Sequence, residues 1–353
     1  MSRVVGKIRV EGGGTIVPTR LVGPIKFFSN APESSELLSV PLATFETPLW
    51  FSVNRGAKIS RAGSGINVLI LKDCMTRSIL LQAQDLSYAA LVQHELLTKH
   101  VEFKKITKKT SSFIEFDNLS VQVIGNLMYL RFSFQTADAS GHNMTTKAAE
   151  ALQNWILQKY PRLSYISLSG NFCTDKKNSA VNSILGRGKH VVAEIVVPRD
   201  ICLKYLRTTP EKIVELNIKK NLIGSIISGS VASANAHFAN MLLAFYLATG
   251  QDAANIVEGS QGIVYAEVKD DNLYFSVTLP NIIVGTVGNG KDLPFAKENL
   301  KLLGCLKKRP AGENSRRLAA IAAITVLCGE LSLLAALTNP DELMRGHLVL
   351  ERK

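Results

Sequence analysis

The chain has 353 residues, of which 46% are apolar and 20% charged, and its formal net charge is +12. This composition excludes a disordered or low-complexity chain, and the length predicts two globular domains or one domain with an insertion. The excess of basic residues favours a polyanionic partner, such as a phosphate-rich ligand, although a generally solubilising surface is the simpler alternative. No zinc finger, aromatic RNA-binding motif or basic heptad helix accompanies this charge, so we expect no nucleic-acid partner.

The first residues, MSRVVGKIRVEGGG, lack the charged-then-apolar order of a secretory signal, which favours the cytoplasm. The five cysteines are an odd number and include no CxxC pair. They therefore predict reduced thiols, with neither a disulfide framework nor a zinc site.

The segment PLATFETPLWFSVNRG, residues 41–56, is mostly apolar around one carboxylate, Glu46. Apolar surroundings raise the pKa of a carboxyl group because burial disfavours its charged form. A carboxyl group that stays protonated at neutral pH can donate a proton during a reaction. Glu46 is therefore a candidate general acid.

Residues 121–135, VQVIGNLMYLRFSFQ, predict a hairpin in which two alternating runs flank a turn at Gly125 and Asn126. Apolar residues at helical spacing from Met144 to Ile156 predict a helix, and the run YISLS predicts a strand after it. We therefore expect a compact α+β unit at about residues 80–167, lying inside a larger domain.

The segment DASGHN, from Asp138 to Asn143, joins the hairpin to this helix. Backbone N–H groups at the start of a helix attract a pyrophosphate, and small residues let the phosphates approach. The segment is not a GxGxxG motif, and Asn143 as an ordinary N-cap is the simpler interpretation.

The polar segment SGNFCTDKKNSAVNSILGRGK, residues 169–189, sets Asp175 beside Lys176 and Lys177. Surface lysines next to an aspartate are common and contribute little to stability. A lysine held near a carboxylate, in a loop that leaves a strand, can instead present a fixed ammonium to an oxyanion. The residues alone leave these two interpretations equal.

Three features follow in the second half of the chain. His237 lies in a run of small residues, where a satisfied buried histidine is the usual outcome. Asp252 follows Gly250 and could simply cap the next helix. The glycine-rich run TVGNGK, residues 286–291, could wrap a phosphate or only turn the chain.

The apolar run at residues 318–337 has the roughly 20 residues needed to cross a bilayer. Glu330 and Ser332 interrupt it, and a carboxylate at that depth costs on the order of 2–3 kcal/mol or more. The run therefore predicts a buried core helix, and we expect no membrane partner.

Together and in this order, these segments resemble the catalytic portion of hydroxymethylglutaryl-CoA reductase, the NADPH-dependent family that makes mevalonate. The TDKK, NAHxAN and GQDAA segments are highly specific, and they are closer to the eukaryote-like and archaeal class than to the second bacterial class. The resemblance covers about residues 16–349. The matching stretches are LATFET with VNRG, DCMTR, DASGHNM, SGNFCTDKKNSAVNSILGRGKHVVAE, ELNIKKNLIGS, NAHFANML, ATGQDAANIVEGS, GTVGNG, and ENSRRLAA with CGELSLLAAL.

This resemblance implies reduction of 3-hydroxy-3-methylglutaryl-CoA to mevalonate and CoA by two successive hydride transfers, as a step of isoprenoid biosynthesis. It implies that Lys176 stabilises the carbonyl oxygen, that Glu46 donates a proton, and that Asp252 links the two in one hydrogen-bonded network. It also implies seven positions that bind the substrate. These are Arg77, Ser169, Asp175, Lys177, Lys220, His237 and Asn240.

The resemblance further implies sites for two phosphorylated ligands and no metal site, which fits the net charge. Ser112 stands where the family often has an arginine near the 2′-phosphate of NADPH, so NADH stays an alternative cofactor, with Lys108 and Lys109 as nearby cations. The positions that match CoA contacts are Asn54, Arg55, Arg207 and His347. Those that match cofactor contacts are Ser111, Asp138, Gly141, Asn143, Gly288 and Gly290.

The family architecture implies an α+β fold, in which a large mixed α/β domain carries an inserted small ferredoxin-like nucleotide-binding domain. The large domain would comprise residues 1–79 and 168–353, and the small domain residues 80–167. The resemblance also implies a homodimer or a dimer of dimers, and because no membrane anchor precedes the matching segments we expect a soluble enzyme. Its active site would lie at the subunit interface, where the lysine loop of one subunit meets the glutamate and aspartate of the other.

The chain departs from the family at its C-terminus. The family has two histidines five residues apart, and here His347 is followed by Arg352. The second histidine normally protonates the departing CoA thiolate, which arginine cannot do because its pKa is above about 12. A thiol pKa near 8.5 still lets the thiolate leave unprotonated, but less readily. The alternative hypothesis is therefore a catalytically impaired homologue that binds CoA thioesters in a regulatory or scaffolding role.

Overall fold

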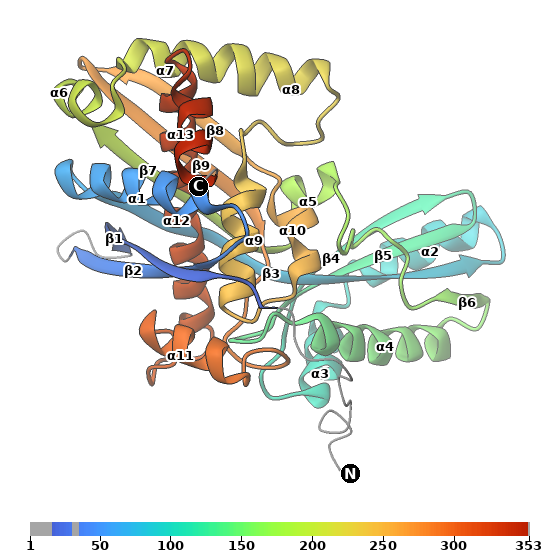
Figure 1. The fold of residues 1–353 in the computed structure, drawn as a ribbon. Coiled ribbons are helices and arrows are strands. Elements are labelled where there is room, and N and C mark those ends of the chain that lie inside the picture. The colour runs from blue at the N-terminus through green and yellow to red at the C-terminus, as the bar shows by residue number, and fades with distance from the viewer. Residues whose placement is uncertain (1–15, 30–34, 352–353) are drawn as a thin grey trace.

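The computed structural model describes residues 16–29 and 35–351 of the chain. Figure 1 shows two lobes side by side, and the long strand β3 (Ile66–Ala83) runs through both. Residues 66–74 of β3 pair with β1 and β7 in the large lobe, and residues 75–83 pair with β5 and β6 in the small lobe. One continuous strand therefore fixes the position of the small lobe relative to the large one.

The large lobe is built on the sheet order β2-β1-β3-β7-β9-β8, in which only β1 and β3 pair in parallel. Its core strands are apolar on the face that the helices cover, as expected for a sheet with one solvated face. Besides β3, its strands are β1 (Thr19–Ser29), β2 (Glu36–Ala43), β7 (Gly188–Val197), β8 (Ile263–Lys269) and β9 (Asn272–Ile282).

Helices of the large lobe connect these strands and include two short π-helical stretches and one 3₁₀ turn. They are α1 (Thr47–Ala62), α5 (Ala180–Leu185), α6 (Arg199–Ile201), π-helix η2 (Cys202–Leu206), α7 (Pro210–Leu216), π-helix η3 (Asn217–Ile223), α8 (Gly224–Ile227), α9 (Phe238–Ala248), 3₁₀ helix η4 (Ala253–Asn255), α10 (Ile256–Gly259), α11 (Pro294–Leu302), α12 (Glu313–Leu337) and α13 (Glu342–Glu351).

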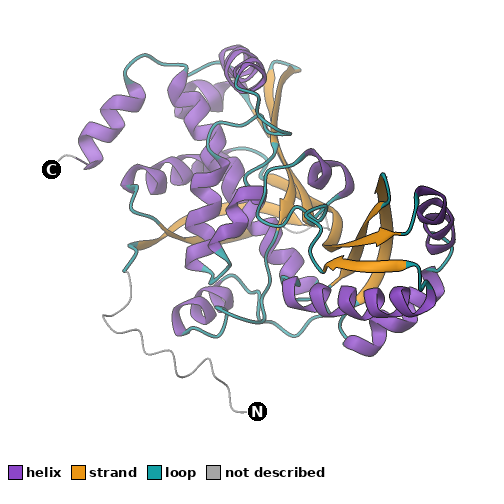
Figure 2. Ribbon diagram, turned by 90° about the vertical axis from the view of Figure 1, so that its right-hand side faces the viewer, coloured by secondary structure: helices purple, strands orange, loops and turns teal. Residues whose placement is uncertain are grey.

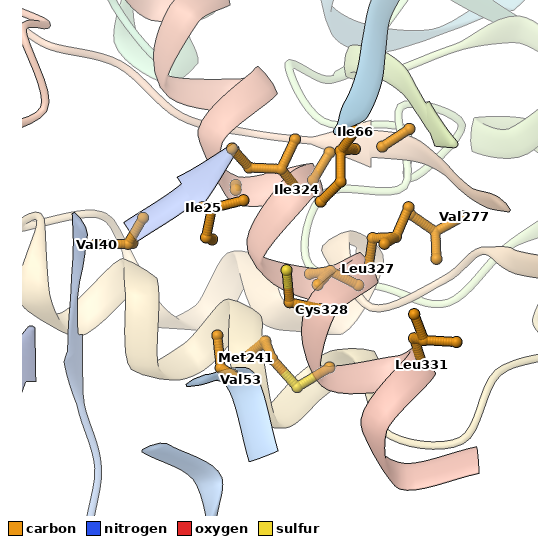
Figure 3. Close-up of a cluster of buried hydrophobic side chains, with 14 of the residues drawn as sticks. Ile25, Val40, Val53, Ile66, Met241, Val277, Ile324, Leu327, Cys328 and Leu331 are labelled. Atoms are coloured by element: carbon orange, nitrogen blue, oxygen red, sulfur yellow. The ribbon is translucent and has the colours of Figure 1, made fainter. Parts of the chain in front are cut away.

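Helix α12 is the centre of the large core, which confirms the prediction of a buried helix at residues 318–337. It is long and apolar enough to cross a membrane, but 94% of its apolar window is buried inside the fold. Figure 3 shows its side chains Ile324, Leu327 and Leu331 packed among residues of β1, β2, α1 and α9. Its length and apolar character are therefore explained by burial in protein.

Helices α1 and α12 approach each other closely at a glycine. A Cβ atom at Gly56 would lie 2.2 Å from the carbonyl oxygen of Cys328, so any larger residue would force the helices apart. Cys328 and the other four cysteines are buried free thiols.

The small lobe runs from the second half of β3 to β6 and has its own hydrophobic cluster. Its strand order, β4-β5-β3-β6, is antiparallel throughout. Its element order is β-α-α-β-β-α-β, which is that of a ferredoxin-like fold with one additional helix in the first crossover. Figure 2 shows its helices packed against its strands. Its elements are α2 (Leu86–Leu96), α3 (His100–Thr110), β4 (Glu115–Ile124), β5 (Leu127–Gln135), α4 (His142–Lys159) and β6 (Leu163–Ser167).

The local predictions for this lobe are confirmed: β4 and β5 form the expected hairpin with its turn at Gly125 and Asn126, and α4 and β6 follow. Edge-to-face contacts among Phe103, Phe116 and Phe132 fill the space between helix and sheet. The α+β fold class is confirmed, and the division into domains at residues 80 and 167 stays a prediction.

Candidate functional site

A cavity of about 560 Å³ lies where β3, the start of α4 and three loops of the large lobe meet. It brings together seven of the residues that the sequence singles out, from five separate segments of the chain. These are Arg77, Gly141, Asn143, Asp175, Lys176, Asp252 and Gly288.

Lys176 and Asp252 form an ion pair at this cavity, with 2.8 Å between Nζ and Oδ2. The hydrogen bond to Asp252 raises the pKa of Lys176 above its ordinary value, so its ammonium stays charged. Burial tends to raise the pKa of Asp252, but the bonds from Lys176 and from the Ala254 N–H outweigh this and hold it below its ordinary value. Asp252 also caps η4 through that N–H, as its sequence position suggested, and its predicted link between Lys176 and Glu46 stays a prediction.

Two side chains hold the lysine loop against α10 and the residues after it. The backbone N–H of Lys176 donates to Glu258 Oε1 at 3.0 Å, and Gln261 bonds both the N–H and the carbonyl of Ser179. Lys176 itself has a left-handed φ of 55°, a conformation that costs a non-glycine residue free energy. These bonds bring Lys176 to Asp252 within one chain, and the expectation that the lysine loop meets residues of a second subunit stays a prediction.

Asp175 is held by a buried arginine that sequence reasoning missed. Arg187 Nη2 donates to Asp175 Oδ1 at 2.6 Å, and its Nη1 donates to the carbonyl of Thr76. His142 Nε2 lies 3.7 Å from the same carboxylate oxygen, but burial, helped by Arg187, lowers the His142 pKa to about 4 and leaves the imidazole neutral. Lys177 is exposed and donates only to the Asp175 carbonyl among the described bonds.

Glu258 is the second residue that sequence reasoning missed, and it is fully buried. Burial raises its pKa, although bonds from Lys176 and Asn255 and the charge of Arg187 act in the opposite direction. The only sequence signal for the two residues was their place within the matching stretches, Arg187 in GRGK and Glu258 in VEGS. That signal gave no indication that both would support the lysine loop.

The start of α4 forms a second wall of the cavity. Gly141 is the N-cap residue with φ of 94°, and a Cβ there would lie 2.7 Å from the Thr136 side chain. Asn143 lies inside the first turn, so its interpretation as the N-cap is wrong: the left-handed turn that starts the helix requires glycine two residues earlier. Asn143 lines the cavity instead.

Asp138 stabilises the start of another helix. Its Oδ2 accepts from the Gly312 N–H at 3.1 Å and its Oδ1 from the Ser315 N–H at 2.9 Å, at the N-terminus of α12. The Asp138 carbonyl accepts from the Thr286 N–H, which joins this turn to the glycine loop at residues 286–291. Asp138 thus joins the turn before α4 to the glycine loop, and both of these segments line the cavity.

The two glycines of that loop differ in role. Gly288 has φ of 98° and open space where a Cβ would lie, and it lines the cavity. Gly290 has φ of 86°, and a Cβ there would lie 2.5 Å from the Gly250 carbonyl oxygen. Gly290 is therefore required for packing, while Gly288 leaves room for a ligand.

A second group is formed by Glu46, Asn240 and His237. None of the three is among the described residues that line this cavity. Asn240 Nδ2 donates to Glu46 Oε2 at 3.0 Å and lies 3.4 Å from His237 Nδ1. His237 Nε2 lies 3.0 Å from the Gly329 carbonyl, so this nitrogen carries the proton. Burial lowers the His237 pKa to about 4, and its contacts with the Gly329 carbonyl and Asn240 confirm the predicted satisfied histidine.

Arg55 and His347 line a third site, a cavity of about 390 Å³ between α1, α12 and α13. Arg55 donates to the carbonyls of Tyr205 and Leu206 and pairs with Glu342 at 2.7 Å. Arg352 lies outside the described residues.

Five further predicted residues lie outside these three groups in the described part of the chain. Asn54 accepts from the Gly23 N–H, Ser111 ends α3, and Ser169, Arg207 and Lys220 are exposed.

The comparisons with known proteins agree with the resemblance. A family model described as hydroxymethylglutaryl-coenzyme A reductase matches residues 12–352. The chain is 43% identical over 340 residues to 3-hydroxy-3-methylglutaryl-coenzyme A reductase of Pyrococcus abyssi, covering 95% of this chain and 82% of that protein. For the enzyme of the same name from Aeropyrum pernix, the identity is 42% over 342 residues, with 96% and 80% covered.

Among solved structures, the class II 3-hydroxy-3-methylglutaryl-CoA reductase of Streptococcus pneumoniae bound to NADPH in open conformations has a TM-score of 0.72. The match covers 95% of this chain and 89% of that one at 20% identity, so it is a likeness of fold. The family match and the archaeal relatives span nearly the whole chain. The chain therefore belongs to the hydroxymethylglutaryl-coenzyme A reductase family of oxidoreductases.

Proposed function

We propose that the chain reduces 3-hydroxy-3-methylglutaryl-CoA to mevalonate and CoA by two successive hydride transfers from NADPH, as a step of isoprenoid biosynthesis in the cytoplasm. The observation that carries this proposal is the single cavity that contains the Lys176–Asp252 pair together with the start of α4. A reducible carbonyl and a dinucleotide would meet there.

The residues at the start of α4 fit a dinucleotide. The first N–H groups of an 18-residue helix have no intrahelical partner and attract phosphate. Gly141 and Gly288 add no side chain on this side of the cavity, and Asn143 offers an amide. When bound, NADPH would supply the hydride.

Lys176 would stabilise the carbonyl oxygen, which takes up negative charge at each of the two reductions. Asp252 holds this ammonium at 2.8 Å and keeps it protonated, so no reorganisation is needed when the charge develops. Glu46, held by Asn240, would donate a proton to the alkoxide.

The remaining predicted contacts belong to the same proposal. Substrate would contact Arg77, Ser169, Asp175, Lys177, Lys220, His237 and Asn240, and CoA would contact Asn54, Arg55, Arg207 and His347. We also propose that the chain forms a homodimer or a dimer of dimers, with the active site near the subunit interface.

The test is the loss of NADPH absorbance when the thioester substrate is added to the purified chain, repeated with NADH. Oxidation of NADPH that depends on the thioester is the expected result, and CoA alone serves as the control. If neither dinucleotide is oxidised, the reductase proposal fails.

A second candidate function, a CoA-thioester-binding homologue with impaired turnover, is favoured by Arg352. We expect this residue to slow reduction of the thioester while reduction of free mevaldehyde is retained, because only the thioester releases a thiolate that needs a proton. Arg352→His should speed thioester reduction by about 10²-fold, the lower range for a general acid, and leave mevaldehyde reduction unchanged.

Measuring kcat/KM for both substrates on both proteins checks this expectation. An unchanged thioester rate in Arg352→His would show that another acid protonates the thiolate, with His347 the first to replace. A wild-type chain that reduces neither substrate but binds the thioester would support the second function.

A further inference from the structure

One cation of the cavity described above has no carboxylate partner. Lys291 lines the cavity with only 6% of its surface exposed, and its Nζ donates to the Asn289 carbonyl at 3.1 Å. Lys291 forms no ion pair in the part of the chain that the structure describes, whereas Lys176 is paired with Asp252. The cavity thus contains a buried ammonium with a single neutral acceptor.

Such an ammonium is unfavourable in the protein alone. It has three donor hydrogens and one described acceptor, and burial without a counterion costs free energy. Burial accordingly lowers the pKa of Lys291, and the negative charge of Asp252 only partly opposes this. An anionic ligand in the cavity would supply the missing counterion.

The surroundings of Lys291 indicate which anion it would bind. Lys291 ends the glycine loop, and Val287 of this loop forms a parallel bridge with Ala139, just before α4. The loop and the helix start are therefore fixed side by side, and both line the cavity. Partial positive charge at a helix N-terminus and an unpaired ammonium suit a group with several phosphate oxygens.

The other unpaired cation of the cavity lies on a different segment. Arg77, on β3, donates two bonds to the hydroxyl of Thr146 and none to a described carboxylate. The proposed function assigns Arg77 to the substrate, so Lys291, on the glycine loop beside the helix start, is the cation left for the dinucleotide.

We propose that Lys291 is a binding residue for the pyrophosphate of the dinucleotide, a role that rests on the proposed function and adds a residue to it. Lys291→Met should weaken NADPH binding about 10- to 100-fold, the range for losing a hydrogen bond to a charged group. Binding of adenosine 2′-monophosphate, which has no pyrophosphate, should be unchanged. Because methionine has a similar shape and no buried charge, the unliganded melting temperature should be equal or higher.

The experiment is titration calorimetry with NADPH and adenosine 2′-monophosphate, together with thermal unfolding and the KM for the thioester. Lys297→Met is the matched control, because it removes an exposed lysine of α11 six residues further along. It should change none of these quantities.

Three binding or kinetic results would each overturn the inference. They are unchanged NADPH affinity in Lys291→Met, an equal loss for both nucleotides, and a raised KM for the thioester alone. A lower melting temperature accompanying the loss would assign Lys291 a structural role and also overturn it. A wild-type chain that binds neither NADPH nor NADH would overturn the proposed function itself, and the inference with it.

Discussion

Lys176→Ala is expected to lower kcat by about 10²–10³-fold for both the thioester and mevaldehyde, as for the loss of one oxyanion donor. Both reductions place negative charge on the same oxygen, so the two substrates should lose activity together. The lysine side chain is 41% exposed, and an ion pair this exposed contributes under about 1 kcal/mol to folding. The melting temperature should therefore hardly change while turnover falls.

The measurement is kcat at saturating NADPH for each substrate, with circular dichroism to confirm folding. Lys301→Ala, which removes an exposed lysine from the last turn of α11, is the control and should keep wild-type turnover. Lys176→Arg keeps the charge but changes the donor geometry, so an intermediate rate is expected. Turnover of Lys176→Ala within about tenfold of wild type would exclude Lys176 as the oxyanion donor.

Elements with a strong local pattern could be predicted from the sequence. The hairpin of β4 and β5 is fixed by alternation and by a Gly-Asn turn, and α12 by a long apolar run whose single carboxylate argued against a membrane. These features depend on residues close together in the chain, so a window of the sequence contains the whole signal.

The support of the lysine loop could not be predicted in this way. Glu258 reaches the backbone of Lys176 from 82 residues away, and Asp138 caps α12 at Ser315 from 177 residues away. The resemblance indicated that Asp138 and Lys176 matter, but not which partners hold them. Lys291 was missed because neither burial nor the lack of a carboxylate partner is visible in the run TVGNGK.

Glu330 is the buried carboxylate of α12, and its position shows why the fold retains it. Its Oε1 accepts from the backbone N–H groups of Ala236 and His237 at 2.8 and 2.6 Å, just before α9. His237 in turn lies beside Asn240, which bonds Glu46. Glu330 therefore stabilises the start of the helix that positions the proposed proton donor.

Glu330→Ala is expected to destabilise the chain by about 2–5 kcal/mol, because it leaves two partly buried N–H groups without this acceptor and opens a cavity in the core. Urea unfolding measures this loss. Thr325→Val is the control: it removes another fully buried polar group of α12, whose hydroxyl bonds only the Ile321 carbonyl of the same helix among the described bonds. A loss no larger than in this control would contradict the proposed support of α9.

The pH dependence of unfolding separates the contribution of the titrating Glu330 carboxyl group from that of the space its side chain fills. Burial raises the Glu330 pKa from 4.5 to about 7, so the folded state binds a proton that the unfolded state releases between these values. The stability from this group is fully present below pH 4.5 and is lost as pH rises through about 7, in total about 3 kcal/mol. Glu330→Gln keeps an acceptor oxygen without titrating, so its stability should lack this decline. If wild type and Glu330→Gln show the same change in unfolding free energy between about pH 5 and about pH 8, Glu330 does not titrate in this range and must enter the folded core already charged.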